Sequence, residues 1–146
     1  MMKTKGRIFV KISSLLFILY GTAELLAIIL SLFSAEAAEE YGMAARLTSP
    51  APALSVTLAI FVPVLFLAAG ILGLLRVGMP GRMRLCFIFG VITLLVVVAD
   101  VVGNTVSGLV TNVAEIGTCI LVIAIPLLYL IGTWRNWRQP ERKKES

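Results

Sequence analysis

Four long apolar runs dominate the sequence. They lie at residues 8–33, 53–75, 85–102 and 113–134. A helix of about 20 mainly apolar residues crosses a hydrocarbon core roughly 30 Å thick. Each run is close to this length, so the sequence predicts an all-α fold, a membrane-spanning four-helix bundle. We expect residues 1–146 to form a single four-span domain, in which 135–146 is a basic cytoplasmic tail.

Composition agrees with a membrane location. Apolar residues make up 59% of the chain and charged residues only 14%, whereas a soluble domain has about 25% charged residues. A soluble core of this size could not bury so many apolar side chains, because small domains have much surface for their volume. The net charge of +5 comes from residues that flank the apolar runs, which favours the lipid bilayer as partner and argues against nucleic acid.

The lysines and arginines predict the orientation. All but one lie in the first tail, between the second and third runs, or in the last tail: Lys3, Lys5, Arg7, Lys11, Arg76, Arg82, Arg84, Arg135, Arg138, Arg142, Lys143 and Lys144. Four spans place these three segments on one side of the membrane, and basic residues favour the cytoplasm. We therefore expect a multi-pass protein of the plasma membrane with both termini in the cytoplasm and Arg46 outside.

The first run also has features of a cleaved signal peptide. Basic residues precede it, and Ala35-Glu36-Ala37 follows it with the spacing of a cleavage site. The apolar stretch at 12–33 is longer than the roughly 7–15 residues of a usual signal core, and it contains Glu24. We therefore expect this run to remain as a transmembrane helix.

Three carboxylates in the outer half of the spans are candidates for a cation or proton site. At a rise of 1.5 Å per residue, Glu24, Asp100 and Glu115 lie roughly 22–28 Å from the inner ends of their spans. Asn104 and Asn112 lie near the same level and are supporting polar candidates. Carboxylates at membrane depth are costly, and the sequence shows no intramembrane lysine or arginine to pair with them. They are expected to be protonated and hydrogen-bonded, to face water, or to bind a cation.

Each carboxylate also has a plain interpretation. Asp100 and Glu115 near the outer boundary would reach water and have no special role. Glu24 is the most central of the three. Its side chain is expected to point into the bundle and to bond with Asp100, Asn104 or Asn112, because a carboxyl that faces lipid has no partner.

Nothing in the sequence indicates an enzyme or a metal site. The chain has no histidine, which is the commonest general base and metal ligand. Cys86 and Cys119 lie inside apolar runs without metal-site spacing and are expected to be unpaired. No nucleophile–base pair is visible, so we expect no catalytic residue, no metal, no cofactor and no enzymatic activity.

Small residues predict how the helices pack. Ala69, Gly70 and Gly73 form a small patch on the second run. Such patches let helices approach closely, either within one bundle or between two copies of the chain.

Short sequence matches raise the hypothesis of a duplicated helical hairpin. Residues 63–67 (PVLFL) are similar to residues 126–130 (PLLYL), and Tyr20-Gly21 loosely matches Phe89-Gly90. Duplication is a recurrent way of building membrane bundles. Apolar helices use few residue types, however, so chance matches are the alternative.

The layout resembles small uncharacterised four-transmembrane-helix membrane proteins of bacteria, of the domain-of-unknown-function type. The shared features are a basic start, Gly21 and Glu24 in the first run, Gly70-Ile71-Leu72-Gly73 closing the second, and Leu128-Tyr129-Leu130-Ile131-Gly132 before a basic tail. This resemblance implies a four-helix membrane bundle and no known activity. A single glutamate in the first of four spans is also similar to the small multidrug resistance transporters, although the long acidic linker departs from their pattern.

Two functions follow from these observations. One is a non-catalytic membrane protein that packs against or regulates a partner, as a homo-oligomer or with another membrane protein. The other is a small proton- or cation-linked transporter or channel with an acidic site in the outer half of the bundle. A holin-like lysis protein is a third option. Whether Glu24 faces a polar cavity or lipid distinguishes the first two.

Overall fold

The computed structural model describes residues 2–79 and 82–138, and this part of the chain is helical without any strand. Its four long helices are α1 (Met2–Phe33), α4 (Pro52–Arg76), α5 (Met83–Val106) and α6 (Val113–Trp137). Two short helices, α2 (Ala35–Glu40) and α3 (Met43–Leu47), lie in the linker between α1 and α4. The predicted fold class, an all-α four-helix bundle, is confirmed.

All four long helices are long and apolar enough to cross a membrane, with a mean hydropathy of 2.2 to 2.8 in their apolar windows. The protein is therefore a multi-pass membrane protein. The helices extend beyond some of the predicted runs: α5 continues through Gly103 and Asn104 to Val106, where the sequence predicted an end at residue 102. It stops where Gly108 takes the left-handed conformation, with φ of 73°, a common way to end a helix.

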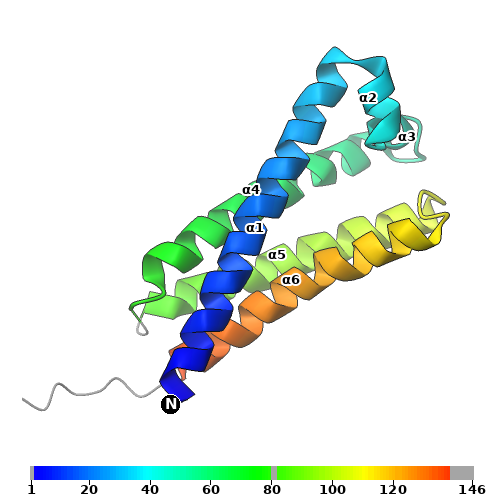
Figure 1. The fold of residues 1–146 in the computed structure, drawn as a ribbon. Coiled ribbons are helices and arrows are strands. Elements are labelled where there is room, and N and C mark those ends of the chain that lie inside the picture. The colour runs from blue at the N-terminus through cyan, green and yellow to red at the C-terminus, as the bar shows by residue number, and fades with distance from the viewer. Residues whose placement is uncertain (1, 80–81, 139–146) are drawn as a thin grey trace, which may run out of the picture.

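The long helices form a ring of two hairpins. Helix α1 packs on α4 and α6, and α5 packs on the same two helices. We call α1 through α4 the first hairpin and α5 with α6 the second (Figure 1). The start of α1 and the end of α6 lie together at what we call the basic end, whereas α2, α3 and the α5–α6 loop lie at the opposite end, the linker end (Figure 1). In Figure 1 the two hairpins diverge toward the linker end.

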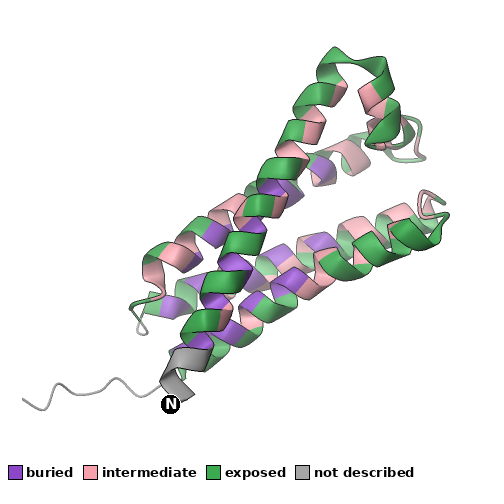
Figure 2. Cartoon of the chain, in the orientation of Figure 1, coloured by how far each residue is buried: buried purple, intermediate pink, exposed green. Residues whose placement is uncertain are grey.

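Among the residues whose burial is described, the buried ones occur only in the half of the bundle toward the basic end. They reach as far as Gly21 in α1, Ala59 in α4, Val97 in α5 and Ile125 in α6, and the purple segments of Figure 2 mark this region. Residues 22–58 and 98–124 are all partly or fully exposed. One half of the bundle is thus tightly packed and the other is loose.

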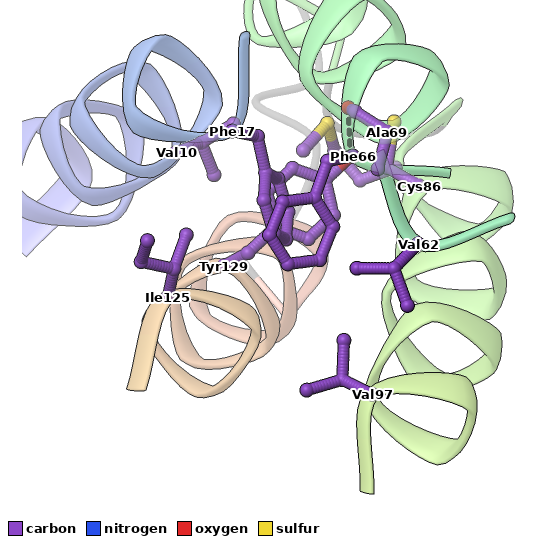
Figure 3. Close-up of a cluster of buried hydrophobic side chains, with 10 residues drawn as sticks. Val10, Phe17, Val62, Phe66, Ala69, Cys86, Val97, Ile125 and Tyr129 are labelled. Carbon is purple, nitrogen blue, oxygen red and sulfur yellow. Dashed lines mark hydrogen bonds between the residues drawn. The ribbon is translucent and has the colours of Figure 1, made fainter. Parts of the chain in front are cut away.

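Aromatic rings fill the centre of the packed half. Phe17 lies 4.8 Å from Phe66 and 5.0 Å from Tyr129, measured between ring centroids (Figure 3). The Tyr129 hydroxyl donates a hydrogen bond of 2.8 Å to the carbonyl oxygen of Ala69. A buried tyrosine needs such a partner, and this bond ties α6 to α4.

The predicted small patch packs inside the bundle. Ala69 is fully buried. A Cβ added at Gly70 would come within 2.8 Å of the Ser14 carbonyl oxygen, and one added at Gly73 would come within 2.8 Å of the Tyr129 ring. These small residues therefore let α1 and α6 approach α4 within a single chain.

Burial repeats between the two hairpins. Six of the seven positions buried in α4 recur as buried positions of α6 at the same spacing, and the seventh, Ala59, corresponds to the partly exposed Val122. The six are Val62, Pro63, Phe66, Ala69, Gly70 and Gly73, which correspond to Ile125, Pro126, Tyr129, Gly132, Thr133 and Asn136. In the same way, buried residues of α1 correspond to buried residues of α5: Ser14, Phe17 and Gly21 match Met83, Cys86 and Gly90. The repeated pattern supports a duplicated hairpin.

Contacts at the two glycines agree with this repeat. A Cβ at Gly21 would meet Phe66 and Leu67 at 3.2 and 3.1 Å, and one at Gly90 would meet Tyr129 and Leu130 at 2.9 and 2.8 Å. The contacted residues stand three and four positions after Pro63 in one hairpin and after Pro126 in the other. Equivalent residues therefore make equivalent contacts in the two hairpins, which is the packing that a duplicated hairpin would have.

Candidate functional site

A polar cavity lies in the loosely packed half of the bundle. It has a volume of about 140 Å³. Side chains from all four long helices and from α3 line it: Tyr20, Glu24, Arg46, Ala59, Val62, Asp100, Val101, Asn104, Thr118, Cys119 and Val122. Two of the three predicted carboxylates, Glu24 and Asp100, therefore share one cavity.

Asp100 pairs with Arg46. The two guanidinium nitrogens of Arg46 lie 2.8 and 3.1 Å from the two carboxylate oxygens of Asp100, and the two side chains are 18% and 14% exposed. Arg46 also donates to the carbonyl oxygen of Ser55 at 3.0 Å. A bidentate pair of this kind is among the stronger polar contacts that proteins form.

This pair corrects the expectation that the carboxylates have no basic partner. Arg46 belongs to the linker, but the linker folds back over the bundle. Gly42 makes this possible, because it adopts the left-handed conformation (φ of 77°) between α2 and α3, which glycine tolerates best. Helix α3 then places Arg46 beside α4 and α5.

Glu24 points into the bundle, as expected from the sequence. It is partly buried and lines the cavity, one helical turn from Tyr20. The partners expected for Glu24 from the sequence, however, do not bond to it. Among the described residues Asp100 bonds with Arg46 and with Asn104, whose Nδ2 lies 3.5 Å from Asp100 Oδ2, and no hydrogen bond joins Glu24 to Asp100, Asn104 or Asn112. The Glu24 carboxylate thus faces the cavity beside an ion pair already formed.

Glu115 and Asn112 lie elsewhere and cap α6. The Asn112 side chain accepts a hydrogen bond of 2.9 Å from the Glu115 backbone, and Glu115 accepts bonds of 2.6 and 3.3 Å from the backbone of Thr111 and Asn112. This is a capping box. The prediction that Glu115 and Asn112 join Glu24 and Asp100 is wrong, and the signal against it was present: asparagine, two residues and glutamate directly before an apolar run.

Several residues of the cavity were not among the site residues predicted from the sequence. Tyr20, Thr118 and Cys119 line it, and Tyr20 and Glu24 are four apart, as residues on one helix face are. Arg46 was visible as the single basic residue of its linker. Cys86 and Cys119 are both free thiols, as predicted.

A second hollow also reaches Asp100. It has a volume of about 200 Å³ and lies among α4, α5 and the residues that follow α3. Its wall includes Ser49, Leu54, Ser55, Ala99, Asp100, Gly103, Asn104 and Ser107. Asp100 and Asn104 therefore line both hollows.

The charges of the cavity do not balance. Glu24 and Asp100 face a single guanidinium, so the ionised site has an excess of one negative charge. Within residues 2–79 and 82–138 no group of three His, Cys, Asp or Glu side chains is arranged to hold a metal ion. The packed aromatic core separates this cavity from the basic end. The site therefore suits a single small cation or a proton that arrives from the linker end.

No protein-family model matches the chain, and no curated protein and no solved structure is significantly similar to it. Its function is therefore argued from the cavity and from the packing around it.

Proposed function

We propose that this chain is a non-catalytic protein of the plasma membrane that binds a small cation, a proton included, as part of proton- or cation-linked transport. The observation that carries the proposal is the cavity that Glu24 lines beside the Arg46–Asp100 ion pair, so that two carboxylates stand against one guanidinium. Ionisable residues at membrane depth commonly mark ion pathways. The excess negative charge favours a cation over an anion or a neutral solute.

The cavity opens toward the outside of the cell in this proposal. Basic side chains gather at the opposite end of the bundle: Arg7, Lys11, Arg76, Arg82, Arg84, Arg135 and Arg138. Phe87 lies there too, with ring centroids 5.6 and 6.0 Å from those of Trp134 and Trp137, and Arg138 lies 4.5 Å from the Trp134 ring. Basic residues favour the cytoplasmic side, and tryptophans favour the headgroup layer. Both support cytoplasmic termini.

The test compares two glutamates. Glu24→Gln removes the cavity carboxylate that is outside the Arg46–Asp100 pair. Glu115→Gln is the matched control, because Glu115 lies in the capping box and glutamine can serve there. Purified protein is reconstituted in vesicles that contain a pH-sensitive dye, and proton movement is followed after a pH step with sodium, potassium or neither present.

We expect the wild type and Glu115→Gln to dissipate the pH gradient at the same rate and Glu24→Gln to lose this activity. Melting temperatures of the three proteins, measured with and without each cation, report binding separately from transport. Equal behaviour of Glu24→Gln and the wild type in both measurements would refute the proposal.

A second candidate function is a packing or regulatory partner of another membrane protein. The observation that favours it is that two of the three predicted carboxylates have structural partners: Asp100 pairs with Arg46, and Glu115 caps α6. Under this hypothesis Glu24→Gln has no effect on any ion-dependent property. Copurification from native membrane would then recover a specific partner protein or a second copy of this chain.

A further inference from the structure

The Arg46–Asp100 pair connects the two hairpins at the end where packing does not. Arg46 lies in the linker of the first hairpin and Asp100 in the second. It is the only salt bridge found among the residues whose side chains are described, 6–79 and 82–138. Other polar contacts between the hairpins lie in the packed half, such as Tyr129 to Ala69 (2.8 Å) and the Asn136 side chain to the Val77 carbonyl (3.1 Å).

Glu24 is a second carboxylate available to the same arginine. It lines the same small cavity as Arg46 and Asp100, but it belongs to the first hairpin. Arg46 directs Nη1 and Nη2 to Asp100 and Nη1 also to the Ser55 carbonyl, and among the described residues it donates no hydrogen bond to Glu24. Arg46 paired with Asp100 bridges the two hairpins. Arg46 paired with Glu24 would bond within the first hairpin, and no ion pair would then join the two hairpins at the linker end.

We infer that Arg46 is a conformational switch, which exchanges between Asp100 and Glu24 and thereby closes or opens the linker end of the bundle. A cation or proton taken up at Asp100 releases Arg46 to Glu24. That trigger rests on the proposed function, whereas the exchange itself depends only on the three side chains. The titratable or charged groups that line the cavity are Tyr20, Glu24, Arg46, Asp100 and Cys119.

The packing allows such an opening. No residue of segments 22–58 and 98–124 is fully buried, and hollows of about 140 and 200 Å³ both reach Asp100. Separating the linker ends therefore disrupts little apolar contact. The segment of α1 beyond Gly21 is about 18 Å long at 1.5 Å per residue, so a small rotation at its base moves its tip appreciably.

Buried prolines mark where the helices can bend. Pro63 lies inside α4 and Pro126 inside α6, one in each hairpin, and each lies at the boundary between the packed and the loose half. Proline removes one backbone hydrogen bond from a helix and is the commonest cause of a kink. The packed half, on the basic-end side of the two prolines, would stay fixed while the linker ends of the hairpins separate.

Distances between spin labels test the opening. Leu32 in α1 and Val113 in α6 are exposed at the linker end, with 76% and 84% of their surface accessible. Labels at these two sites, in a chain with Cys86 and Cys119 replaced by alanine, are measured by pulsed electron paramagnetic resonance in lipid nanodiscs. Labels at Ile8 and Leu85, which are exposed near the basic end, are the control pair.

We expect Asp100→Asn and Arg46→Gln to give a longer and broader distance at the linker end and an unchanged distance at the basic end. Glu24→Gln alone should keep the wild-type distances, because Arg46 stays on Asp100. Unchanged linker-end distances in Asp100→Asn and Arg46→Gln would overturn the switch.

A double-mutant cycle tests the exchange in the chain with its natural cysteines. Glu24→Gln should leave the melting temperature of the wild type nearly unchanged. In the Asp100→Asn background the same substitution should lower it, because Arg46 then depends on Glu24. Glu115→Gln, the control, should shift the melting temperature equally in both backgrounds.

Equal shifts by Glu24→Gln in the two backgrounds would also overturn the switch. The outcome is separable from that of the proposed function. Ion binding that fails while the label distances and the cycle behave as expected refutes the function and keeps the switch. Ion binding that depends on Glu24 with unchanged label distances keeps the function and refutes the switch.

Discussion

Gly73 lies at the point where α1, α4 and α6 come closest together. A Cβ on this residue would lie 2.8 Å from the Tyr129 ring and would overlap the Ser14 hydroxyl oxygen. Ser14 and Tyr129 are fully buried, so neither side chain can move aside without disturbing the core. The packed half of the bundle therefore depends on the absence of a side chain at this position.

We expect Gly73→Ala to destabilise the protein by about 1–3 kcal/mol, the usual cost of overfilling a packed core. This cost outweighs the gain of roughly 1 kcal/mol that alanine brings over glycine in a helix. The measurement is thermal unfolding of purified protein in detergent. Gly117→Ala in α6 is the control, because a Cβ there meets no atom within 4 Å. A melting temperature for Gly73→Ala at or above that of the wild type would contradict this account.

The sequence predicts whether a polar side chain points into the bundle better than it predicts which residue that side chain bonds to. The inward direction of Glu24 follows from the energy of a carboxyl in lipid, which depends on the residue alone. The pairing of Asp100 with Arg46 depends on how the linker folds back after Gly42, and nothing in the apolar runs encodes that path. The depth of Glu115 predicts a place beside Glu24, whereas Asn112, three residues earlier, predicts that Glu115 caps α6. The structure shows the cap.

Helix α6 shows how local chemistry sets the end of an element. Its first turn exposes backbone N–H groups that need acceptors, and the side chains of Asn112 and Glu115 supply them. The first turn lies in the loose half of the bundle, where residues 113–124 are partly or fully exposed. Tertiary packing gives this turn little support, so the cap should control its stability.

We expect Asn112→Ala to destabilise the start of α6 by about 1 kcal/mol, within the range of 0.5–2 kcal/mol typical for a lost N-cap. Hydrogen exchange should become faster at the first turn of α6 and remain unchanged at its Tyr129 end. Asn104→Ala is the comparison, because Asn104 lies inside α5 and caps no helix. Equal exchange at the α6 start in Asn112→Ala and in the wild type would show that packing, not the cap, holds this turn.

At the element scale, the four helices follow from the length of the apolar runs, whereas some of their ends do not. Gly103 and Asn104 resemble a break in the sequence, yet α5 continues through both. An Asn104–Asp100 contact one turn apart (3.5 Å) lies along this stretch, and Gly108 then ends the helix in a conformation suited to glycine. Helix-breaking residues in the sequence thus indicate roughly where a helix ends. The exact end lies beside the residue that adopts a positive φ.

The whole molecule combines a tight half and a loose half, and the sequence does not distinguish them. Apolar side chains face both the core and the lipid, so the hydropathy of a residue does not show which of the two it contacts. Burial shows the difference: α1 is buried at Phe17 and exposed at Leu30 and Leu32. The small residues Gly70 and Gly73 were the sequence signal that pointed to the tight half.

The side of the membrane on which the loose half lies decides what can reach the cavity. The linker end holds one basic residue, Arg46, and its side chain is paired with Asp100. Among the residues whose side chains are described, the other basic ones lie at the basic end: Arg7, Lys11, Arg76, Arg82, Arg84, Arg135 and Arg138. Basic residues near the spans favour the cytoplasm. This asymmetry predicts that the cavity faces outward.

Reporter fusions test the orientation directly. We expect fusions after Gly42 to be active outside the cell, and fusions after Gly78 and after Ser146, which lies outside the described residues, to be active in the cytoplasm. Arg46→Gln should leave all three results unchanged, because a single residue on the outer side contributes little to an asymmetry set by the basic segments. A cytoplasmic signal at Gly42 would reverse the orientation. The cavity would then face the cytoplasm, and the cation of the proposed function would have to come from inside the cell.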